Sequence, residues 1–595
     1  MERSQLPLRL WPGVAIVSGQ WIVRFGLPLV WPDGSLFAVI GGLLGLVGVI
    51  IWWLFFSRAA WFDRIAAIGL MFAALAATYP LLDVSLATGA MGGLFLMLAA
   101  PGLCLAFVLW AVVSRRWSIG LQRATMVAAI VAPCLVWTLL RTGGFTGAFD
   151  HDLAWRWTPT AEDRLLALRD DTPPPPPAAP PVQPAPPTES APPTREASPP
   201  AAAPATPVNA SLDWPGFRGR DRDGAARGVR IATDWSSAPP QELWRRPIGP
   251  GWSSFSINGD VFYTQEQRGE EEIVAAYRVS TGAPVWKHRD HARFWESNGG
   301  PGPRGTPTLH NGRVYSLGAT GILNVLDESS GRVIWSRNAG TDSDTAIPDW
   351  GFAASPLLID DLVIVAVAGT LVAYDRESGA RRWVGSDGGP GYSSPHLVTL
   401  HGVPQIVLLD AKGATSVSPS SGERLWSVTV TTSGMAAPIV QPAMTADGDM
   451  LIAAGDISGL HRIAVTTDGG AWAATSRWST NGLKPYFNDF VVHNGHAFGF
   501  DGSLLACIDL ADGKRKWKGG RYGNGQLVLL PDQDLLLVVT EEGELALVSA
   551  ATDKFTELAR IPAITGKTWN HPVLAGDVLL VRNGEEMAAF RLATR

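Results

Sequence analysis

The sequence predicts an all-β eight-bladed propeller with four-stranded antiparallel blades, preceded by an α-helical transmembrane domain of about five helices. Long apolar runs fill the N-terminal part, a Pro-rich stretch follows them, and the C-terminal part repeats a turn that leads to a tryptophan. The 595 residues also exceed the roughly 250 to 300 at which one core stops growing. We therefore expect a helical anchor (1–142), a juxtamembrane segment with a short helix (143–170), a Pro-rich disordered tether (171–210) and the propeller (211–595).

Charge and cysteine content exclude several classes of protein. The formal net charge is −6 and the isoelectric point is about 6.0. With no basic excess, nucleic acid is not an expected partner. Cys104, Cys134 and Cys507 form neither a vicinal pair nor a CxxC motif, so no disulfide framework is expected.

Apolar runs predict the membrane spans. Crossing about 30 Å of hydrocarbon takes about 20 apolar residues in a helix. Four runs are long enough, near Leu36–Phe56, Ile65–Leu82, Leu94–Val113 and Ala124–Leu140. A fifth, Trp11–Val30, contains Gln20 and Arg24, and a charge within a span is costly unless it faces other helices or reaches the interface. Arg24 fits a helix-packing or snorkelling residue, with part of a quinone or ion site as the alternative.

The arginines give the orientation. They precede the first span and lie in the loops that join spans two to three and four to five, whereas the alternate loops at Asp33 and Asp83 contain neither Lys nor Arg. By the positive-inside rule the N-terminus is cytoplasmic and the propeller is periplasmic or otherwise extracytoplasmic, with the anchor in a bacterial inner (cytoplasmic) membrane. With five spans, the arginine-rich loops and the C-terminal part lie on opposite sides of the membrane. With four spans they would lie on the same side.

The juxtamembrane segment and the tether differ in composition. Thr158–Asp170 predicts a short helix, with Thr160 as N-cap and Asp163 in the capping-box position. Residues 171–208 are almost wholly Pro, Ala, Thr and Ser, which cannot bury a core and favour an extended polyproline helix. We interpret them as a spacer, with a motif for a Pro-binding module as the alternative.

The C-terminal part repeats at the period of propeller blades, about 40 to 50 residues. A glycine precedes the tryptophan by four residues in five copies: YRVSTGAPVW ending at Trp286, LDESSGRVIW at Trp335, YDRESGARRW at Trp383, VSPSSGERLW at Trp426 and IDLADGKRKW at Trp517. The glycine suits a tight turn with positive φ, and each tryptophan is expected to pack between neighbouring blades.

Eight first strands can be counted, starting near Ser253, Thr306, Ser355, Ser394, Ala437, Asp489, Gln526 and His571. The last unit has only three strands before the chain ends, and an orphan strand with Trp244 precedes the first unit. This N-terminal strand is expected to complete blade eight and close the ring, which removes exposed edges.

The turn-and-tryptophan repeat, the eight-blade count and the opening DWPGFRGRDRDG (213–224) resemble the pyrroloquinoline quinone (PQQ)-like propeller family. The resemblance covers roughly residues 213–595 and implies one of two functions. One group of this family comprises PQQ-dependent quinoprotein dehydrogenases, which bind Ca²⁺, and the other is the non-catalytic propeller lipoprotein of outer-membrane assembly. A five-span anchor resembles membrane-bound glucose dehydrogenase, but long insertions and vicinal cysteines, which many such enzymes have, are missing.

The loops that lead into the first strands should converge at the propeller axis, where a ligand would bind. From them we select aromatic and polar residues suited to a flat or anionic ligand: Trp252, Arg304, Trp350, Tyr392, Asn488, Asp489, Trp569 and His571. The alternative is that they only shape and seal the blade starts.

Metal motifs are weak. His288, His291 and Glu296 have metal-binding residue types but follow an outer strand, which favours surface solvation. Asp221 and Asp223 do not have the closing Glu of a Ca²⁺ loop, which favours a turn. No metal site is therefore predicted, no catalytic residue is assigned, and PQQ with Ca²⁺ is the only cofactor considered.

The sequence favours a non-catalytic scaffold that binds proteins of the cell envelope. The complete blades without recognisable catalytic insertions motivate this hypothesis. The alternative is a PQQ-dependent dehydrogenase that oxidises an alcohol or sugar and reduces membrane quinone. A shared fold does not decide between the two.

Overall fold

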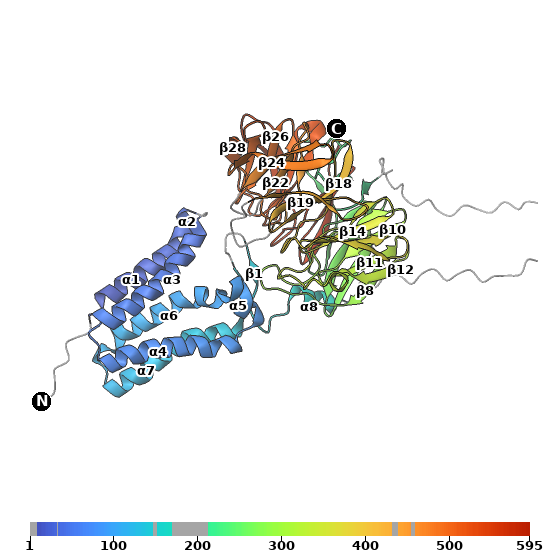
Figure 1. Ribbon diagram of the computed structural model, residues 1–595. Helices are drawn as coiled ribbons and strands as arrows, with labels where there is room; N and C mark the ends of the chain where they lie inside the picture. The colour runs from blue at the N-terminus through green and yellow to red at the C-terminus, as the bar shows by residue number, and fades with distance from the viewer. Residues whose placement is uncertain (1–8, 32–33, 147–150, 169–211, 431–437, 454–458) are drawn as a thin grey trace, which may run out of the picture.

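The computed structural model describes residues 9–31, 34–146, 151–168, 212–430, 438–453 and 459–595. Figure 1 shows a bundle of helices, a β-propeller, and a short connecting part between them. The predicted tether (171–210) lies outside the described residues, as does Ala437.

The anchor has five segments long and apolar enough to cross a membrane: Trp11–Val30, Ser35–Phe56, Trp61–Leu81, Leu94–Arg116 and Ile119–Leu139. This confirms the predicted helical part. The helices within them are α1 (Trp11–Trp21), α2 (Leu27–Val30), α3 (Ser35–Ile51), α4 (Trp61–Thr78), α6 (Leu94–Val113) and α7 (Ile119–Leu135), with the short α5 (Val84–Thr88) before α6.

The polar residues of the first span lie against its neighbours. Gln20 is buried, and its Nε2 donates to the Gly42 carbonyl at 2.6 Å. Arg24 lies in a π-helical turn, Ile22–Gly26, with its guanidinium 5.3 Å from the Phe25 ring centre. The glycines of α3 allow this close packing, because a Cβ at Gly45 would lie 2.4 Å from Gln20.

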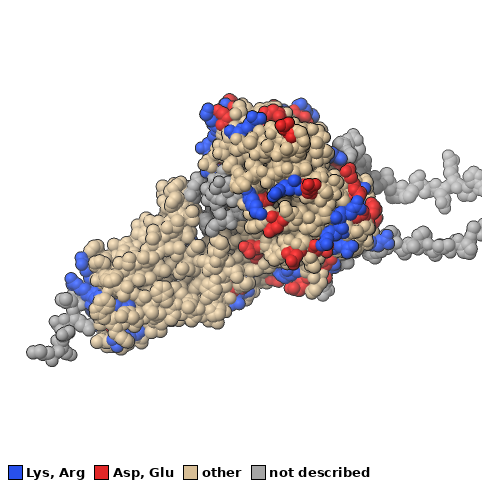
Figure 2. Space-filling model, in the orientation of Figure 1, with Lys and Arg blue, Asp and Glu red and all other residues tan. Residues whose placement is uncertain are grey.

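Basic side chains gather at the end of the helical bundle that lies away from the propeller (Figure 2). The connections and helix ends that join α3 to α4 and α6 to α7 contain Arg58, Arg64, Arg115, Arg116 and Arg123. Arg123 pairs there with Asp63 at 2.8 Å. These arginines and the propeller therefore lie at opposite ends of the anchor.

A hairpin and a short helix connect the anchor to the propeller. The hairpin consists of β1 (Leu140–Phe145) and β2 (His151–Trp155), which the sequence did not predict. Helix α8 (Ala161–Leu166) begins with the expected capping box, in which the Asp163 amide donates to Thr160 Oγ1 at 2.9 Å and the Thr160 amide donates to Asp163 Oδ2 at 2.8 Å.

Eight antiparallel blades of four strands each form the propeller, as predicted, and the sheet of the first blade is extended by a fifth strand, β3 (Asp213–Trp214). The first four blades are β5 (Ser256–Asn258), β6 (Val261–Arg268), β7 (Glu271–Arg278) and β8 (Pro284–His291); β9 (Thr308–His310), β10 (Arg313–Leu317), β11 (Ile322–Asp327) and β12 (Val333–Asn338); β13 (Leu357–Ile359), β14 (Leu362–Val367), β15 (Thr370–Asp375) and β16 (Arg381–Val384); and β17 (His396–Leu400), β18 (Val403–Asp410), β19 (Gly413–Val417) and β20 (Arg424–Thr429). A helical turn, α9 (Ala339–Asp342), follows the second blade.

The other four blades are β21 (Ala443–Met444), β22 (Met450–Ala453), β23 (Leu460–Asp468) and β24 (Ala471–Thr480); β25 (Val491–His493), β26 (His496–Asp501), β27 (Leu504–Asp509) and β28 (Arg515–Gly519); β29 (Gln526–Leu530), β30 (Leu535–Val539), β31 (Glu544–Ser549) and β32 (Glu557–Pro562); and β33 (Val573–Ala575), β34 (Val578–Arg582), β35 (Glu586–Arg591) and β4 (Gln241–Pro247). Blade eight is thus closed by the N-terminal β4, which pairs antiparallel with β35.

A repeated contact joins neighbouring blades. The indole of Trp335 in blade two lies on Gly379 in the last turn of blade three, and its Nε1 donates to the Arg376 carbonyl of that turn at 3.0 Å. Gly379 has φ +67°, and a Cβ there would lie 2.7 Å from the indole. The same contact joins Trp244 to Gly282, Trp286 to Gly331 and Trp383 to Gly422. The glycine of each motif therefore makes room for the tryptophan of the preceding blade.

Blades four, five and six vary this contact. Blade five has no glycine four residues before a tryptophan, yet its Trp478 lies on Gly513 of blade six and its Nε1 donates to the Leu510 carbonyl. Trp426 instead donates to Gln405 Oε1 of its own blade at 2.8 Å. Trp517 donates to the Ala551 carbonyl of blade seven at 2.8 Å.

Replacing Trp335 by Ala should destabilise the propeller by about 3 to 5 kcal/mol, the usual loss for a buried aromatic side chain. Gly379→Ala should also destabilise it, because the new methyl group meets the indole. Gly402→Ala is the matched control, since Gly402 has φ +79° but no atom within 4 Å of an added Cβ. Thermal unfolding of the full chain in detergent measures all three. Equal shifts for Gly379→Ala and Gly402→Ala would contradict the packing role.

Candidate functional site

The loops that lead into the first strands gather at one end of the propeller axis, which we call the mouth (residues 250–255, 303–307, 349–356, 386–395, 484–490 and 565–572). The connecting part contacts the propeller at this end. The Glu162 carboxylate of α8 accepts two bonds from Arg293, at 2.9 and 3.0 Å, and one from the Gly269 amide at 2.7 Å. Gly269 is in the turn between β6 and β7. The mouth is therefore at the end of the propeller axis that faces the connecting part and the anchor.

An aromatic chain runs along the mouth. Ring centres are 4.9 Å apart for Trp252 and Trp569, 4.8 Å for Trp569 and Phe487, and 5.0 Å for Phe487 and Tyr486. Tyr486 then lies 6.5 Å from Trp350, which is 5.0 Å from Tyr392. Four of these six aromatic residues were selected from the sequence, and the structure brings them together through Tyr486 and Phe487.

Lys567 lies among these rings, with its Nζ 4.4 Å from the Trp569 ring centre and 5.4 Å from that of Trp252. The ammonium donates to the Asn298 carbonyl at 3.1 Å. Burial lowers the pKa of Lys567 to about 8, and Glu296 and Glu541 oppose this change by favouring the charged form. Lys567 was not selected from the sequence because a lone lysine in a loop gives no signal.

Arg304 closes one side of the mouth. Its guanidinium pairs with Glu296 at 3.0 Å and donates to the carbonyls of Gly302 and Gly300 at 2.6 and 2.9 Å. It also lies 5.0 Å from the Phe294 ring centre. Burial lowers the pKa of Arg304 below its ordinary value. The residue therefore holds the loops together and offers little free charge to a ligand.

A buried ion-pair network lies deeper than the aromatic chain. Asp489 Oδ2 lies 2.9 Å from His571 Nε2 and 3.3 Å from Arg218 Nε. Burial alone would raise the pKa of Asp489, but Arg218 and His571 outweigh it and lower that pKa. Asn488 is fixed separately, because its Oδ1 accepts from the Tyr486 amide at 3.0 Å. The structure thus joins Asp489 and His571 but gives Asn488 a role within its own loop.

Arg218 belongs to a segment that crosses the propeller axis, residues 213–226. Its first strand, β3 (Asp213–Trp214), pairs with the inner strand β5, at the end that the turn Asn258–Asp260 occupies. The Pro215 carbonyl accepts from the Leu309 amide of blade two, and the Ala226 amide donates to Leu529 of blade seven. This crossing segment enters from the end of the axis opposite the mouth.

Arg222 fixes the crossing segment to blades three and four. Its guanidinium donates to the carbonyls of Pro395, at 3.0 Å, and of Pro356. The buried His396 lies close enough that burial, Arg222 and Arg218 together lower its pKa to about 3. The sequence analysis considered Asp221 and Asp223 of this segment as possible ion ligands. In the structure, Arg218 and Arg222 make its side-chain contacts with the blades.

The weaker sequence candidates take part in local structure. His288 Nε2 lies 3.3 Å from Asp290, and Glu296 pairs with Arg304 rather than with the histidines. Asp221 and Asp223 pair with Arg227 at 3.4 and 2.5 Å. Among the described residues, no three His, Cys, Asp or Glu side chains are placed to hold a metal ion.

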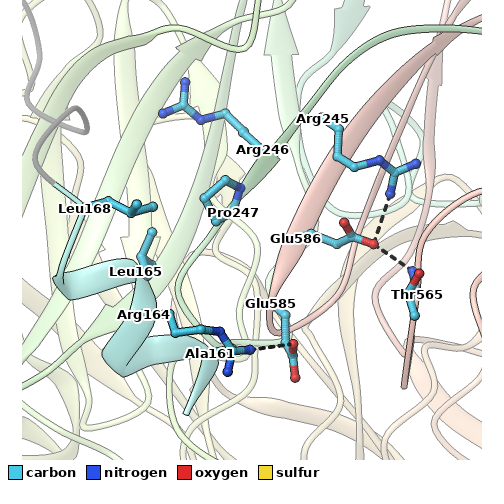
Figure 3. A pocket seen from close by; sticks show the side chains of 10 residues that line it. All are labelled: Ala161, Arg164, Leu165, Leu168, Arg245, Arg246, Pro247, Thr565, Glu585 and Glu586. Atoms are coloured by element: carbon cyan, nitrogen blue, oxygen red, sulfur yellow. Dashed lines mark hydrogen bonds and ion pairs between the residues drawn. The ribbon is translucent and has the colours of Figure 1, made fainter. Parts of the chain in front are cut away.

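A shallow pocket lies between α8 and the ends of β4 and β35 (Figure 3). Its charged side chains are paired. Arg164 lies 3.8 Å from Glu585, Arg245 lies 3.0 Å from Glu586, and Arg246 donates to the Gly282 carbonyl at 2.5 Å. The pocket is the seam along which α8 packs on the propeller.

Comparison with known proteins supports the resemblance found in the sequence. Residues 270–519 match the PQQ_2 family model, described as the outer membrane protein assembly factor BamB. The match runs from the third strand of blade one to the last strand of blade six. The anchor and the crossing segment lie outside it. A search of curated proteins finds no match.

Similar solved structures include two quinohemoprotein alcohol dehydrogenases and a BamB protein. The quinohemoprotein alcohol dehydrogenase ADHIIG from Pseudomonas putida HK5 has 13% identity and a TM-score of 0.49, over 64% of this chain and 81% of its own. The corresponding enzyme from Comamonas testosteroni has 14% identity and a TM-score of 0.49, over the same shares. BamB from Moraxella catarrhalis has 12% identity and a TM-score of 0.44, over 59% of this chain and 100% of its own.

The residues at the mouth do not fit PQQ with Ca²⁺. Calcium takes six to eight oxygen ligands, mainly carboxylates and carbonyls. Of the carboxylates at the mouth, Asp489 is held by Arg218 and His571, Glu296 by Arg304, and Glu541 accepts from Trp569 Nε1 at 2.8 Å. The aromatic chain could stack on a flat ligand. Of the buried oxygens of these three carboxylates, only Asp489 Oδ1 has no hydrogen-bond partner, which falls short of the set of oxygen ligands that Ca²⁺ takes.

Lys567 should titrate near pH 8, far below the ordinary 10.5. Between these values the folded chain binds fewer protons than the unfolded chain, so the contribution of Lys567 to stability rises as pH rises through this window. The pH dependence of Lys567 acylation, followed by mass spectrometry, measures its pKa. Glu541→Gln should lower that pKa further, because it removes a charge that favours the ammonium form. An unchanged pKa in this variant, or a wild-type value near 10.5, would contradict the arrangement.

Proposed function

We propose that this chain is a membrane-anchored binding or assembly scaffold of the cell envelope. Its anchor lies in the bacterial inner membrane with the N-terminus in the cytoplasm, and its propeller lies in the periplasm. The match of blades one to six to a family model described as an outer membrane protein assembly factor supports this proposal.

The crossing segment is the observation that carries the proposal. It occupies the propeller axis from the far end, and its Arg218 and Arg222 are bound to Asp489 and to blade carbonyls. A general acid or base must be able to exchange a proton with a substrate. The carboxylate of Asp489 is instead buried and bound to both His571 and Arg218. The mouth then offers aromatic surface with few free charges, which suits binding of a protein partner.

Reconstitution distinguishes the scaffold from the PQQ-dependent dehydrogenase. The purified full chain in detergent is mixed with PQQ and Ca²⁺, and dye reduction is followed with alcohols and aldoses. We expect neither stoichiometric PQQ binding nor substrate-dependent dye reduction. An apo-quinoprotein dehydrogenase treated in parallel shows that the reagents work. One PQQ bound per chain, with turnover, would overturn the scaffold proposal.

Cross-linking in cells tests the binding role directly. A photoreactive amino acid at position 350, in the mouth, should give a discrete cross-linked product with an envelope protein. Position 475, on the exposed outer strand β24, is the control. Equal products from both positions, or none from the mouth, would count against a partner at the mouth.

Fusions of alkaline phosphatase test the orientation. A fusion after Arg595 should be active, because the propeller is placed outside the cytoplasm. A fusion after Arg116, in an arginine-rich loop, should be inactive. The reverse result would place the propeller in the cytoplasm.

A further inference from the structure

Two exposed tryptophans stand out in the connecting part. Trp155 and Trp157 stack on each other, with ring centres 5.2 Å apart and planes at 8°. Their exposed fractions are 48% and 67%, whereas the blade tryptophans Trp335 and Trp426 are 9% and 4% exposed. Leu153, two residues earlier on β2, is 40% exposed. This apolar surface has no covering element among the described residues.

Arg156 fixes the position of the two tryptophan rings relative to the ends of the membrane-spanning segments. Its Nη1 donates to the carbonyls of Leu81 and Thr138, both at 3.2 Å. Its backbone amide donates to the Leu139 carbonyl at 3.0 Å. Leu81 and Leu139 are the last residues of the third and fifth membrane-spanning segments. The residue between the two tryptophans is thus bound to the ends of two spans on the propeller side.

This position matches the membrane–water interface. The hydrocarbon ends where the spans end, and tryptophan concentrates at the headgroup level, where its ring is buried and its N–H stays in a polar region. We propose that Trp155, Trp157 and Leu153 lie in the headgroup region of the leaflet on the propeller side and form a lipid-contacting surface. This surface is separate from the five spans and from the mouth.

The surface also sets the position of the mouth. The hairpin that contains Trp155 reaches Lys567 on its other side, since a Cβ at Gly144 would lie 2.6 Å from Lys567 Nζ. The Thr142 amide of the same hairpin donates to Ser85 Oγ in α5, at 3.0 Å. The lipid-contacting surface, the anchor and the mouth are therefore joined through one short hairpin, and the mouth is held close to the bilayer surface.

Fluorescence quenching in nanodiscs tests the proposal. The three native cysteines are buried, so a new cysteine can be labelled selectively. The Trp157→Cys variant of the full chain is labelled at the new cysteine with an environment-sensitive dye. It is placed in nanodiscs of phosphatidylcholine and phosphatidylglycerol whose lipids have a nitroxide at either a shallow or a deep position of the acyl chain. Thr475→Cys on blade five is the aqueous control, and Phe72→Cys in α4, 60% exposed, is the mid-membrane control.

We expect the dye at position 157 to be quenched several-fold more by the shallow than by the deep nitroxide, whereas position 72 shows the reverse and position 475 shows neither. The proposal would be overturned if the dye at position 157 were quenched no more by the lipid nitroxides than the dye at position 475. It would also be overturned if the dye were protected from both lipid and aqueous quenchers, as in a protein contact. Because Trp157→Cys removes one ring, Leu153→Cys provides a second label with both rings kept.

Hydroxyl-radical oxidation of the wild type should also spare Trp155 and Trp157 in nanodiscs relative to Leu397 and Val403, which are exposed on blade four. Equal oxidation would contradict lipid contact.

Discussion

The contact of a tryptophan with the glycine of the next blade holds the ring together. At Trp244, Trp286, Trp335, Trp383 and Trp478 the indole fills the space that a side chain would take at the turn, and its N–H donates to a carbonyl of that turn. The contact therefore requires two residues from consecutive repeats, which explains why glycine and tryptophan recur at a fixed spacing. It also closes the ring, because Trp244 of the closing strand meets Gly282 of blade one in the same way that Trp335 meets Gly379. A propeller joined by such contacts has no blade that is stable by its own core alone.

The axis of this ring is fixed by a different kind of interaction. Arg218 and Arg222 bring two buried charges among the inner strands, and buried charges are tolerated only when they are paired and hydrogen-bonded. Asp489 supplies the carboxylate for one arginine, and blade carbonyls receive the other. These contacts connect the crossing segment to blades that are far apart in the sequence. The axis is thus rigid below the mouth, and variation in function is left to the aromatic chain above it.

Local patterns made much of the fold predictable. Apolar length gave the five spans, the turn motif gave the blades, and the missing fourth strand of blade eight required β4. Blade five shows the limit, because Trp478 makes the interblade contact without the motif, and only the neighbouring turn of blade six reveals it. The hairpin β1–β2 was missed because both strands are short and β1 contains Gly143 and Gly144. Within the site, aromatic residues in loops could be selected one by one, but Lys567, Phe487 and Arg218 acquire their roles from residues distant in sequence.

The described residues on either side of the Pro-rich stretch contact the propeller at different places. A spacer that carries a domain away from a membrane should have its domain only on its far side. Helix α8, which precedes the stretch, is instead bound to the propeller through Glu162 and Arg293. Leu168 lines the pocket between α8 and the ends of β4 and β35, whereas the Leu212 carbonyl accepts from the Gly259 amide at the opposite end of the axis. The described residues on both sides of 169–211 are thus bound to the propeller. The distance between the mouth and the bilayer is set by the hairpin, Arg156 and α8, which are short and directly bonded to both the anchor and the propeller.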